Sequence, residues 1–307
     1  MSLSVTILGS NSATPTSERF SSAQVVQAGH EWLLLDCAEG TQIQLRRNKI
    51  SLLKIKHIFI SHLHGDHFFG LIGLLTTVHL LGQKETVTVF GPELLRSVIE
   101  YQLEVTETTL RYPLNFIAID PAKFKIIFQN KELSVTSVPL QHGIPCCGFL
   151  IREKESLRHV RKDLGLEKTI PLEAFKALQA GKDVINMKGE LILNQEVTLP
   201  GKSSVSYAYC TDTAFHESLS DLIKDVTCLF HEATFMEKEL HLAREKQHST
   251  ARDAARIARL ACAKKLIIGH FSARYKNLSE LLQEARDIFP STDLAEDSKT
   301  FLIDNTL

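Results

Sequence analysis

Three histidines and one aspartate fall within six residues of this 307-residue chain, in the stretch SHLHGDH at residues 61–67. The four residues are His62, His64, Asp66 and His67. Imidazole nitrogens combined with a carboxylate are ligands for zinc and, less specifically, for manganese or iron. Because the cluster contains no cysteine, its ligand types favour a catalytic metal site over a structural one. We therefore expect this stretch to bind a catalytic metal ion, Zn2+ in the first place and Mn2+ as the alternative.

The elements around the stretch explain how these side chains can converge. The apolar run IKHIFI before it predicts a buried β-strand, and FFGLIGLLTTVHLLG after it predicts a helix. Side chains alternate along extended backbone, so His62 and His64 are expected to point the same way. Asp66 and His67 then lie at the start of the helix.

Further ligand candidates follow later apolar runs. His142 ends LSVTSVPLQH, Asp212 follows VSYAYCT, and His270 follows KLIIG. Open α/β folds place functional groups at the carboxyl ends of their strands. Any one of the three alone would be read as an ordinary loop residue. Their recurrence at the same kind of position predicts a second set of metal ligands.

Composition and charge limit the classes of protein. The chain is 44% hydrophobic and 23% charged with a net charge of −1, which is typical of a soluble globular protein. Nucleic-acid binding would therefore need a local basic patch. Six cysteines without CxxC spacing indicate reduced thiols. With no leader-like segment and no run of 18 apolar residues, we expect a cytoplasmic protein without a membrane span.

Strand-like and helix-like runs alternate over most of the chain, which predicts an α/β fold. STARDAARIARLACA is predicted to be an amphipathic helix, and its start carries the capping-box pattern Thr250-x-x-Asp253. Residues 152–202 differ, because they hold ten Lys or Arg and eight Asp or Glu with few long apolar runs. We interpret residues 152–202 as an insertion with a solvated surface.

The motifs together resemble a known family. HxHxDH with later His, Asp and His residues is similar to the metallo-β-lactamase superfamily. LLLDCAEGTQIQL, ISHLHGDHFFGLIGLL, HGIPCCGF, TDT, HEATF, HST and GHFSARY, in this order, resemble the short form of the ribonuclease Z family. The resemblance implies a four-layer αββα metallo-β-lactamase sandwich over residues 1–307. It also implies a homodimeric endoribonuclease that removes the 3′ trailer from precursor tRNA, leaving a 3′-hydroxyl on the tRNA and a 5′-phosphate on the trailer.

The resemblance also implies roles for individual residues. Two Zn2+ ions per subunit are expected, the first held by His62, His64, His142 and Asp212, and the second by Asp66, His67, Asp212 and His270, so that Asp212 bridges them. Asp66 would take the proton of the attacking water, and His248 would act near the scissile phosphate with Glu232 as its acidic partner. Asp36 would support the ligand loop, and Arg274 would hold phosphate oxygens through paired donors.

Residues 152–202 occupy the place of the family's inserted exosite arm, which implies contact with the body of the tRNA. Basic side chains available for phosphate contacts are Lys154, Arg158, Arg161, Lys162, Lys168, Lys176 and Lys182. The chain departs from the bacterial pattern at the tip of the arm, where LEKTIPLEAFKAL replaces a Gly-Pro tip. It also departs in the loop PTSERF, where Ser17 and Phe20 replace a basic residue and an amide.

Three other functions compete with this one. A general metal-dependent phosphodiesterase acting on small or single-stranded nucleic acids would keep the same metal ligands. A thioester or lactone hydrolase would share only HxHxDH, and HST and HFSARY argue against it. A metal-binding but inactive RNA-binding protein would not need Asp66 and His248. The salt dependence of tRNA binding separates the first alternative from a tRNA enzyme.

Overall fold

The computed structural model describes residues 3–154, 157–164, 166, 170–201 and 204–304. Lys168 lies outside the described residues. The chain divides into two compact units: a larger one made of Met1–Arg152 and Val205–Leu307, and a smaller one, Glu153–Ser204. None of the described helices is long and apolar enough to span a membrane.

The first sheet of the larger unit has seven strands in the order β18-β1-β2-β3-β4-β5-β6. Their bounds are β18 (Thr300–Ile303), β1 (Leu3–Gly9), β2 (Ala23–Ala28), β3 (Glu31–Leu35), β4 (His57–Phe59), β5 (Val87–Pro92) and β6 (Leu114–Ile119). Pairs from β18 to β3 are antiparallel, and pairs from β3 to β6 are parallel. The sheet is therefore mixed.

The second sheet also has seven strands, in the order β17-β16-β15-β14-β9-β8-β7. Their bounds are β17 (Thr292–Leu294), β16 (Lys265–Gly269), β15 (Cys228–Glu232), β14 (Ser206–Cys210), β9 (Cys146–Glu153), β8 (Leu133–Leu140) and β7 (Lys125–Gln129). Strands β14 to β17 are parallel, whereas β14 pairs antiparallel with β9. In that antiparallel pair Arg152 lies opposite Ser206, at the two points where the chain leaves and re-enters the larger unit.

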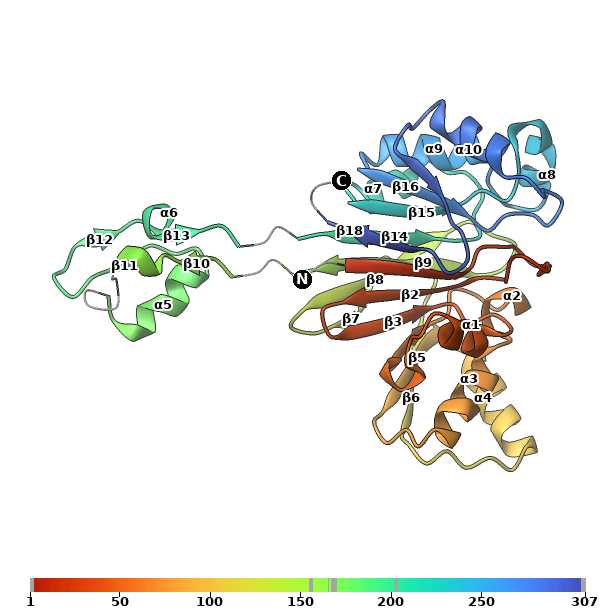
Figure 1. Ribbon diagram of the computed structural model, residues 1–307, viewed down its shortest axis with the longest axis horizontal. Coiled ribbons are helices and arrows are strands. Elements are labelled where there is room, and N and C mark those ends of the chain that lie inside the picture. Colours follow the sequence, from red (N-terminus) through yellow and green to blue (C-terminus); the bar gives the residue numbers. More distant parts are fainter. Residues whose placement is uncertain (1–2, 155–156, 165, 167–169, 202–203, 305–307) are drawn as a thin grey trace. The chain divides into compact units, whose positions relative to one another are not determined.

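Helices cover both outer faces of the two sheets (Figure 1). On the first sheet these are α1 (Thr41–Arg47), α2 (Gly65–Phe68), α3 (Leu71–Leu80) and α4 (Leu94–Val105), with the 3-10 turn η1 (Leu52–Lys54). With the second sheet are α7 (Ser218–Leu222), α8 (Leu240–Glu245), α9 (Ala251–Leu260), α10 (Ser279–Arg286) and the turn η4 (Glu237–Glu239). The predicted four-layer αββα sandwich is confirmed.

Alternating side chains build the two cores of the larger unit. Leu33 and Leu35 of β3 pack in the cluster between the sheets, with residues such as Tyr207 from the second sheet. Leu34 points the other way and packs with Leu45 of α1 in the outer cluster. A strand buried on both faces reads as a continuous apolar run, which is why EWLLLD resembles a buried strand in the sequence.

The smaller unit has its own small core, made of Leu166, Ile170, Leu178, Val184 and Val197. Its described helical elements are α5 (Leu172–Gln179), α6 (Asn194–Val197) and the turn η2 (Lys162–Leu164). Its described strands form two short antiparallel pairs: β10 (His159–Val160) with β13 (Thr198–Leu199), and β11 (Val184–Ile185) with β12 (Leu191–Ile192). We refer to residues 153–204 as the arm from here on.

Candidate metal centre

Parallel strands bring the polar candidates to one edge of the two sheets. Asp36 follows β3, the His62–His67 stretch follows β4, and Asp212 follows β14. Glu232 ends β15, and His270 follows β16. The carboxyl ends of neighbouring parallel strands lie at the same edge, so residues distant in sequence become neighbours there.

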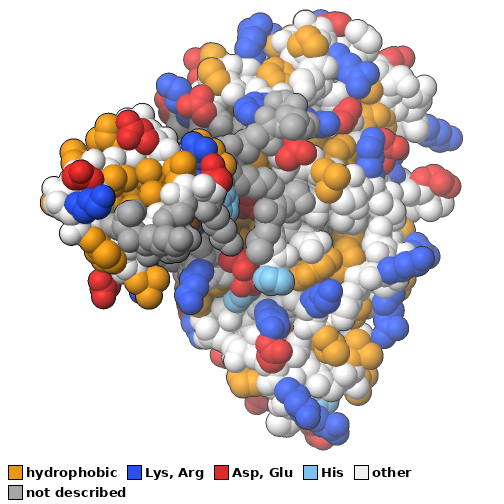
Figure 2. All heavy atoms as spheres, turned by 60° about the vertical axis from the view of Figure 1, so that its left-hand side comes forward, with side chains coloured by type: hydrophobic (Ala, Val, Ile, Leu, Met, Phe, Trp, Pro, Cys, Tyr) orange, Lys and Arg blue, Asp and Glu red, His pale blue; other side chains and the backbone are white. Residues whose placement is uncertain are grey.

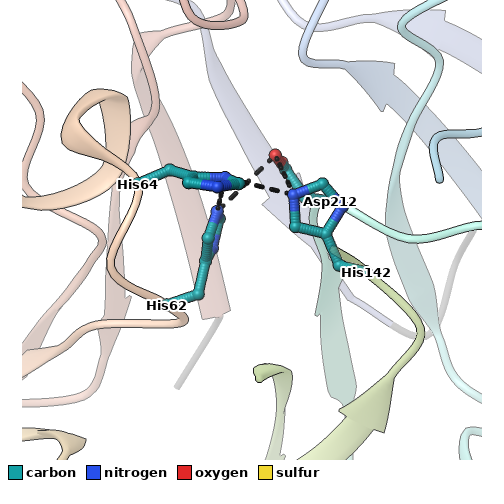
Figure 3. A group of neighbouring side chains, drawn as sticks. All are labelled: His62, His64, His142 and Asp212. Atoms are coloured by element: carbon teal, nitrogen blue, oxygen red, sulfur yellow. Dashed lines mark hydrogen bonds and ion pairs between the residues drawn. The ribbon is translucent and has the colours of Figure 1, made fainter. Parts of the chain in front are cut away.

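The first donor group consists of His62, His64, His142 and Asp212 (Figure 3). The Nε2 atoms of His62 and His142 each lie 3.1 Å from Nδ1 of His64. Each also lies 3.6 Å from Oδ2 of Asp212. The three imidazoles approach from different sides and turn one nitrogen each toward the carboxylate.

The second donor group consists of Asp66, His67, Asp212 and His270. Nε2 of His67 lies 3.4 Å from Oδ2 of Asp66 and 3.3 Å from Oδ1 of Asp212. Nε2 of His270 lies 3.5 Å from Oδ2 of Asp66 and 3.0 Å from Oδ1 of Asp212. The two carboxylate oxygens of Asp212 thus face different groups, which is the geometry of a bridging ligand.

These separations match those expected between neighbouring ligands of one metal ion. Ligand bonds of about 2.0–2.1 Å to zinc place neighbouring donor atoms about 3.3 Å apart. The donor atoms within the two groups are 3.0–3.6 Å apart along the contacts just given. The described donor atoms are therefore spaced as ligands of a divalent metal ion are.

The ring nitrogens that face away from the centre are held by neighbouring groups. Nδ1 of His62 contacts the Ser61 hydroxyl at 2.9 Å, and Nδ1 of His142 contacts the Gln247 carbonyl at 3.1 Å. Nδ1 of His67 lies 2.7 Å from Oδ2 of Asp36, and Nδ1 of His270 lies 2.9 Å from the Thr234 hydroxyl oxygen. Such outer contacts fix the tautomer and orientation of metal-binding histidines.

Two buried nitrogens of the second group lack hydrogen-bond partners. They are Nε2 of His67 and Nε2 of His270, which both point at the carboxylates. Buried polar atoms are normally satisfied, so each such exception calls for an explanation. A cation among these nitrogens and carboxylates supplies one.

The electrostatics of the centre favour a positive charge. Burial by itself would raise the pKa of Asp212, but His270, His67 and His62 hold it well below its usual range. Burial would lower the pKa of His67, but the carboxylates of Asp212, Asp36 and Asp66 raise it well above its ordinary value. A proton or a metal ion is therefore stabilised between the imidazoles and the carboxylates.

Asp36 lies beneath both groups and is fully buried. Its Oδ1 accepts from the backbone N–H of Ser61, and its Oδ2 accepts from the Ser61 hydroxyl, His67 Nδ1 and the phenol of Tyr209. It adopts a left-handed backbone with φ of 55°, which is uncommon outside glycine. Such strain persists where surrounding contacts over-determine a residue, as four donors do here.

The helix that carries His67 packs closely on the loop after Asp36. Cys37 donates its N–H to the carbonyl of His67 at 2.7 Å, and Gly70 donates to the carbonyl of Cys37 at 2.9 Å. A Cβ at Gly70 would lie 1.9 Å from the carbonyl oxygen of Ala38. Only glycine permits this approach, which sets the position of the ligand stretch.

His248 and Glu232 form a pair beside the metal ligands. Nδ1 of His248 lies 2.7 Å from Oε1 of the fully buried Glu232. The His248 ring is 5.0 Å from that of His142 and 5.5 Å from that of His270, and so adjoins a ligand of each group. Burial lowers the pKa of His248, but the Glu232 carboxylate outweighs it and raises this pKa to about 9.

Arg274 is exposed near this pair. Its Nε donates to the Ser272 hydroxyl at 3.1 Å, and its guanidinium carbon lies 5.0 Å from the centre of the Phe235 ring. The same Phe235 ring is 6.1 Å from that of His248. Among the described residues no carboxylate forms an ion pair with Arg274, so the guanidinium remains available to an anionic ligand.

Comparison with known proteins supports the resemblance in the sequence. The model of a family described as anti-Pycsar protein Apyc1 matches residues 3–159, which include the His62–His67 stretch and His142. A curated ribonuclease Z from Parabacteroides distasonis is 42% identical over 293 residues, covering 95% of this chain and 96% of that protein. The chain belongs to the ribonuclease Z family. A curated ribonuclease Z from Prochlorococcus marinus is 39% identical over 310 residues, covering 97% of this chain and 99% of that protein.

Solved structures agree with the ribonuclease Z family and its fold. The short form of human tRNase Z has a TM-score of 0.70 at 28% identity, with 98% of this chain and 99% of that chain covered. The metallo-β-lactamase fold protein YhfI from Bacillus subtilis has a TM-score of 0.69 at 18% identity, with 98% and 100% covered. At that identity the second likeness shows the fold alone.

The structure brings together all seven residues predicted as ligands, and it places Asp36, Glu232 and His248 beside them. Sequence reasoning missed Ser61, Tyr209 and Thr234, which contact these residues directly. Ser61 lies inside the motif ISHLHGDH and Thr234 inside HEATF. Both could have been found from the sequence, because each lies within two residues of a predicted site residue. Tyr209 gave no signal, because a tyrosine in an apolar strand reads as core.

Proposed function

We propose that this chain is a metal-dependent endoribonuclease that removes the 3′ trailer from precursor tRNA. The observation that carries the proposal is one centre in which two four-residue donor groups share Asp212, with the His248–Glu232 pair adjoining both. Membership of the ribonuclease Z family supplies the substrate. Close relatives over nearly the whole chain carry that name, and a short-form tRNase Z has the same fold.

The donor set supports two divalent ions per subunit, Zn2+ in the first place and Mn2+ as the alternative. His62, His64, His142 and Asp212 would hold one ion, and Asp66, His67, Asp212 and His270 the other. When bound, such a pair lowers the pKa of a water molecule and neutralises charge on the phosphate oxygens. Imidazole nitrogens mixed with carboxylates suit zinc better than magnesium or calcium, which prefer oxygen ligands.

The protein's own residues would move the protons and hold the phosphate. Water attacks phosphorus, and the Asp66 carboxylate accepts its proton, since neighbouring histidines keep this carboxylate ionised in spite of burial. The bond between phosphorus and the tRNA 3′-oxygen breaks, and His248 gives its proton to that oxygen. Glu232 orients the imidazole through Nδ1. Arg274 holds non-bridging phosphate oxygens.

The arm would hold the body of the tRNA. Lys154, Lys176 and Lys182 are exposed, whereas Arg158 bonds Thr198 and Arg161 pairs with Asp163. Lys and Arg side chains are interspersed with Asp and Glu on the face in Figure 2, in keeping with the net charge of −1. Phosphate contacts would therefore come from individual exposed lysines.

A homodimer and a cytoplasmic location complete the proposal. The homodimer rests on the family resemblance, and light scattering after size exclusion tests it by giving the mass of one or two chains. The location is supported by the six free cysteines, five of them buried, which suit a reducing compartment.

Cleavage of a 5′-labelled precursor tRNA with a 3′ trailer tests the function, with Asp66→Ala as the inactive control. We expect a single cut after the discriminator nucleotide, which the variant does not make. Bis-p-nitrophenyl phosphate is assayed in parallel. Hydrolysis of this small diester without a site-specific cut in the tRNA would instead indicate a general phosphodiesterase.

A further inference from the structure

Thr234 lies between the two functional parts of the centre and is 4% exposed. Its hydroxyl oxygen is 2.5 Å from Oε2 of Glu232 and 2.9 Å from Nδ1 of His270. The same hydroxyl lies 2.9 Å from the carbonyl oxygen of His270, and its backbone N–H donates to Oε2 of Glu232 at 3.2 Å. One side chain thus touches a metal ligand and the carboxylate that orients His248.

Strand register produces this contact. Glu232 lies opposite Gly269 in the parallel pair of β15 and β16, so the chain leaves both strands at the same level. The loops remain joined beyond the strands, where Ala233 donates its N–H to the carbonyl of Gly269 at 2.8 Å. His270 takes a left-handed backbone with φ of 58°, at the point where its side chain enters the centre.

Donor and acceptor counting gives the direction of the bond between the Thr234 hydroxyl and Nδ1 of His270. A threonine hydroxyl has one hydrogen and two lone pairs, and a carboxylate can only accept. The carboxylate of Glu232 and the carbonyl oxygen of His270 both can only accept, so the single hydrogen of the hydroxyl serves these two oxygens. The hydroxyl oxygen therefore accepts from Nδ1–H of His270. This places the hydrogen of His270 on Nδ1 and leaves the lone pair of Nε2 directed at Asp66 and Asp212.

The same bonds limit how Glu232 can turn. Its Oε2 accepts from the hydroxyl and the N–H of Thr234, while its Oε1 accepts from the N–H of Thr213 at 2.7 Å and from Nδ1 of His248. With Oε2 held by Thr234, Oε1 faces His248. The carboxylate is thereby fixed from both ends.

We infer that Thr234 is a positioning residue that couples the His270 ligand to the Glu232–His248 pair. This inference rests on the proposed function, because it assigns Thr234 a task within the same centre. One hydroxyl sets the tautomer of His270 and the rotation of Glu232 at once. Loss of that hydroxyl would disturb the second donor group and the placement of His248 together.

The test compares Thr234→Val, which keeps the shape and removes the hydroxyl, with Thr234→Ser, which keeps the hydroxyl. We expect Thr234→Val to lower kcat on precursor tRNA by about tenfold or more with KM little changed, and to weaken zinc binding at the second donor group. Thr234→Ser should stay within about threefold of the natural chain, because it preserves the bonds to Glu232 and His270.

Substrate choice separates an effect through His248 from one through His270. The p-nitrophenolate ion leaves without needing a proton, so an effect through His248 is smaller on bis-p-nitrophenyl phosphate than on precursor tRNA. An effect through His270 lowers activity on both substrates and also lowers zinc content. In a His248→Ala background, Thr234→Val should lose its effect through His248 and keep only its effect through His270. Its effect on precursor tRNA should therefore be smaller than in the natural chain, because residues that act together are not additive.

Either of two results would overturn the inference: native kcat and zinc content in Thr234→Val, or equal losses in Thr234→Val and Thr234→Ser. Zinc content, measured by mass spectrometry of the metal, does not depend on the substrate. If the natural chain left precursor tRNA uncut, the proposed function would fail, and zinc content and diester hydrolysis would still decide the role of Thr234.

Discussion

The phenol of Tyr209, in the second sheet, donates a hydrogen bond of 2.8 Å to Oδ2 of Asp36, which follows β3 of the first sheet. Asp36 holds His67 through the same oxygen. The second donor group takes residues from both sheets, since His67 follows a strand of the first sheet and Asp212 a strand of the second. The bond between Tyr209 and Asp36 therefore ties the sheets together directly beneath the metal ligands.

Tyr209→Phe should weaken zinc binding by about tenfold, because partners of ligand histidines contribute that much or more to metal affinity. Tyr207→Phe is the matched control. Tyr207 is equally buried in the same strand and bonds Gln24 of the first sheet, away from the metal ligands. Both variants should lose about 1–3 kcal/mol of stability, and only Tyr209→Phe should change the midpoint of a zinc competition with a chelator. Equal zinc affinity in the two variants would contradict the role given to Tyr209.

Asp212→Asn should impair both donor groups, since each carboxylate oxygen faces a different group. His64→Ala should impair the first group only. After dialysis against limiting zinc we expect well under one ion per chain in the first variant and about one in the second. If Asp212→Asn kept one tightly bound ion while losing the other, Asp212 would serve a single group and would not bridge.

Removal of the arm should separate tRNA recognition from chemistry. Arg152 and Ser206 are opposite each other in an antiparallel pair, so a two-residue turn would join Glu153 to Val205, and residues 154–204 can be replaced by an Asn-Gly hairpin turn. Hydrolysis of bis-p-nitrophenyl phosphate should persist. Cleavage of precursor tRNA at physiological salt should fall by about tenfold or more, because the phosphate contacts supplied by the arm are lost. Undiminished tRNA cleavage would remove the arm from the proposed function.

A lysine variant of the intact arm provides a finer measurement. Lys176, Lys182 and Lys188 are exposed in the smaller unit. Replacing all three by glutamine should reduce the slope of log binding constant against log salt by about 2–3, if each lysine neutralises one phosphate. The expected result is a shallower slope with unchanged hydrolysis of the small diester. An unaltered slope would place the phosphate contacts elsewhere.

Cysteine labelling reports on the core of the larger unit. Burial raises the pKa of Cys37 and of Cys228 to about 12, and it raises the pKa of Cys146, Cys147 and Cys210 as well. Cys262 is exposed. Because the thiolate is the reactive form, iodoacetamide at neutral pH should modify Cys262 alone in the folded protein and all six cysteines after unfolding. The intact mass gives the count, and two or more adducts on the folded chain would contradict this packing.

Much of the fold was predictable because local signals agree with burial. The run LSVTILG is β1, and the predicted capping box is present in α9, where the Thr250 hydroxyl accepts from the N–H of Asp253. The motif HST thus combines two roles. His248 pairs with Glu232 beside the donor groups, and Thr250 caps the N-terminus of α9. The predicted strand before the ligand stretch is likewise present as β4.

The remainder depended on contacts that no local pattern contains. Strand β18 pairs with β1, and Thr6 and Thr300 meet across 294 positions of sequence. The arm's strands are two residues long, too short to show a period. The two candidate donor groups were predictable because histidine and aspartate are rare at the ends of apolar strands. Tyr209 was not, because its task depends on a carboxylate from the other sheet.

The pairing of Arg152 with Ser206 has an evolutionary consequence. The segment between them starts and ends at one pair of opposed residues in the sheet. The entropic cost of closing such a loop rises only with the logarithm of its length. Insertions, deletions and rearranged tips can therefore accumulate between the two residues while the strands on either side keep their register. The sequence of the arm can thus change while the strands that position the candidate metal centre stay as they are.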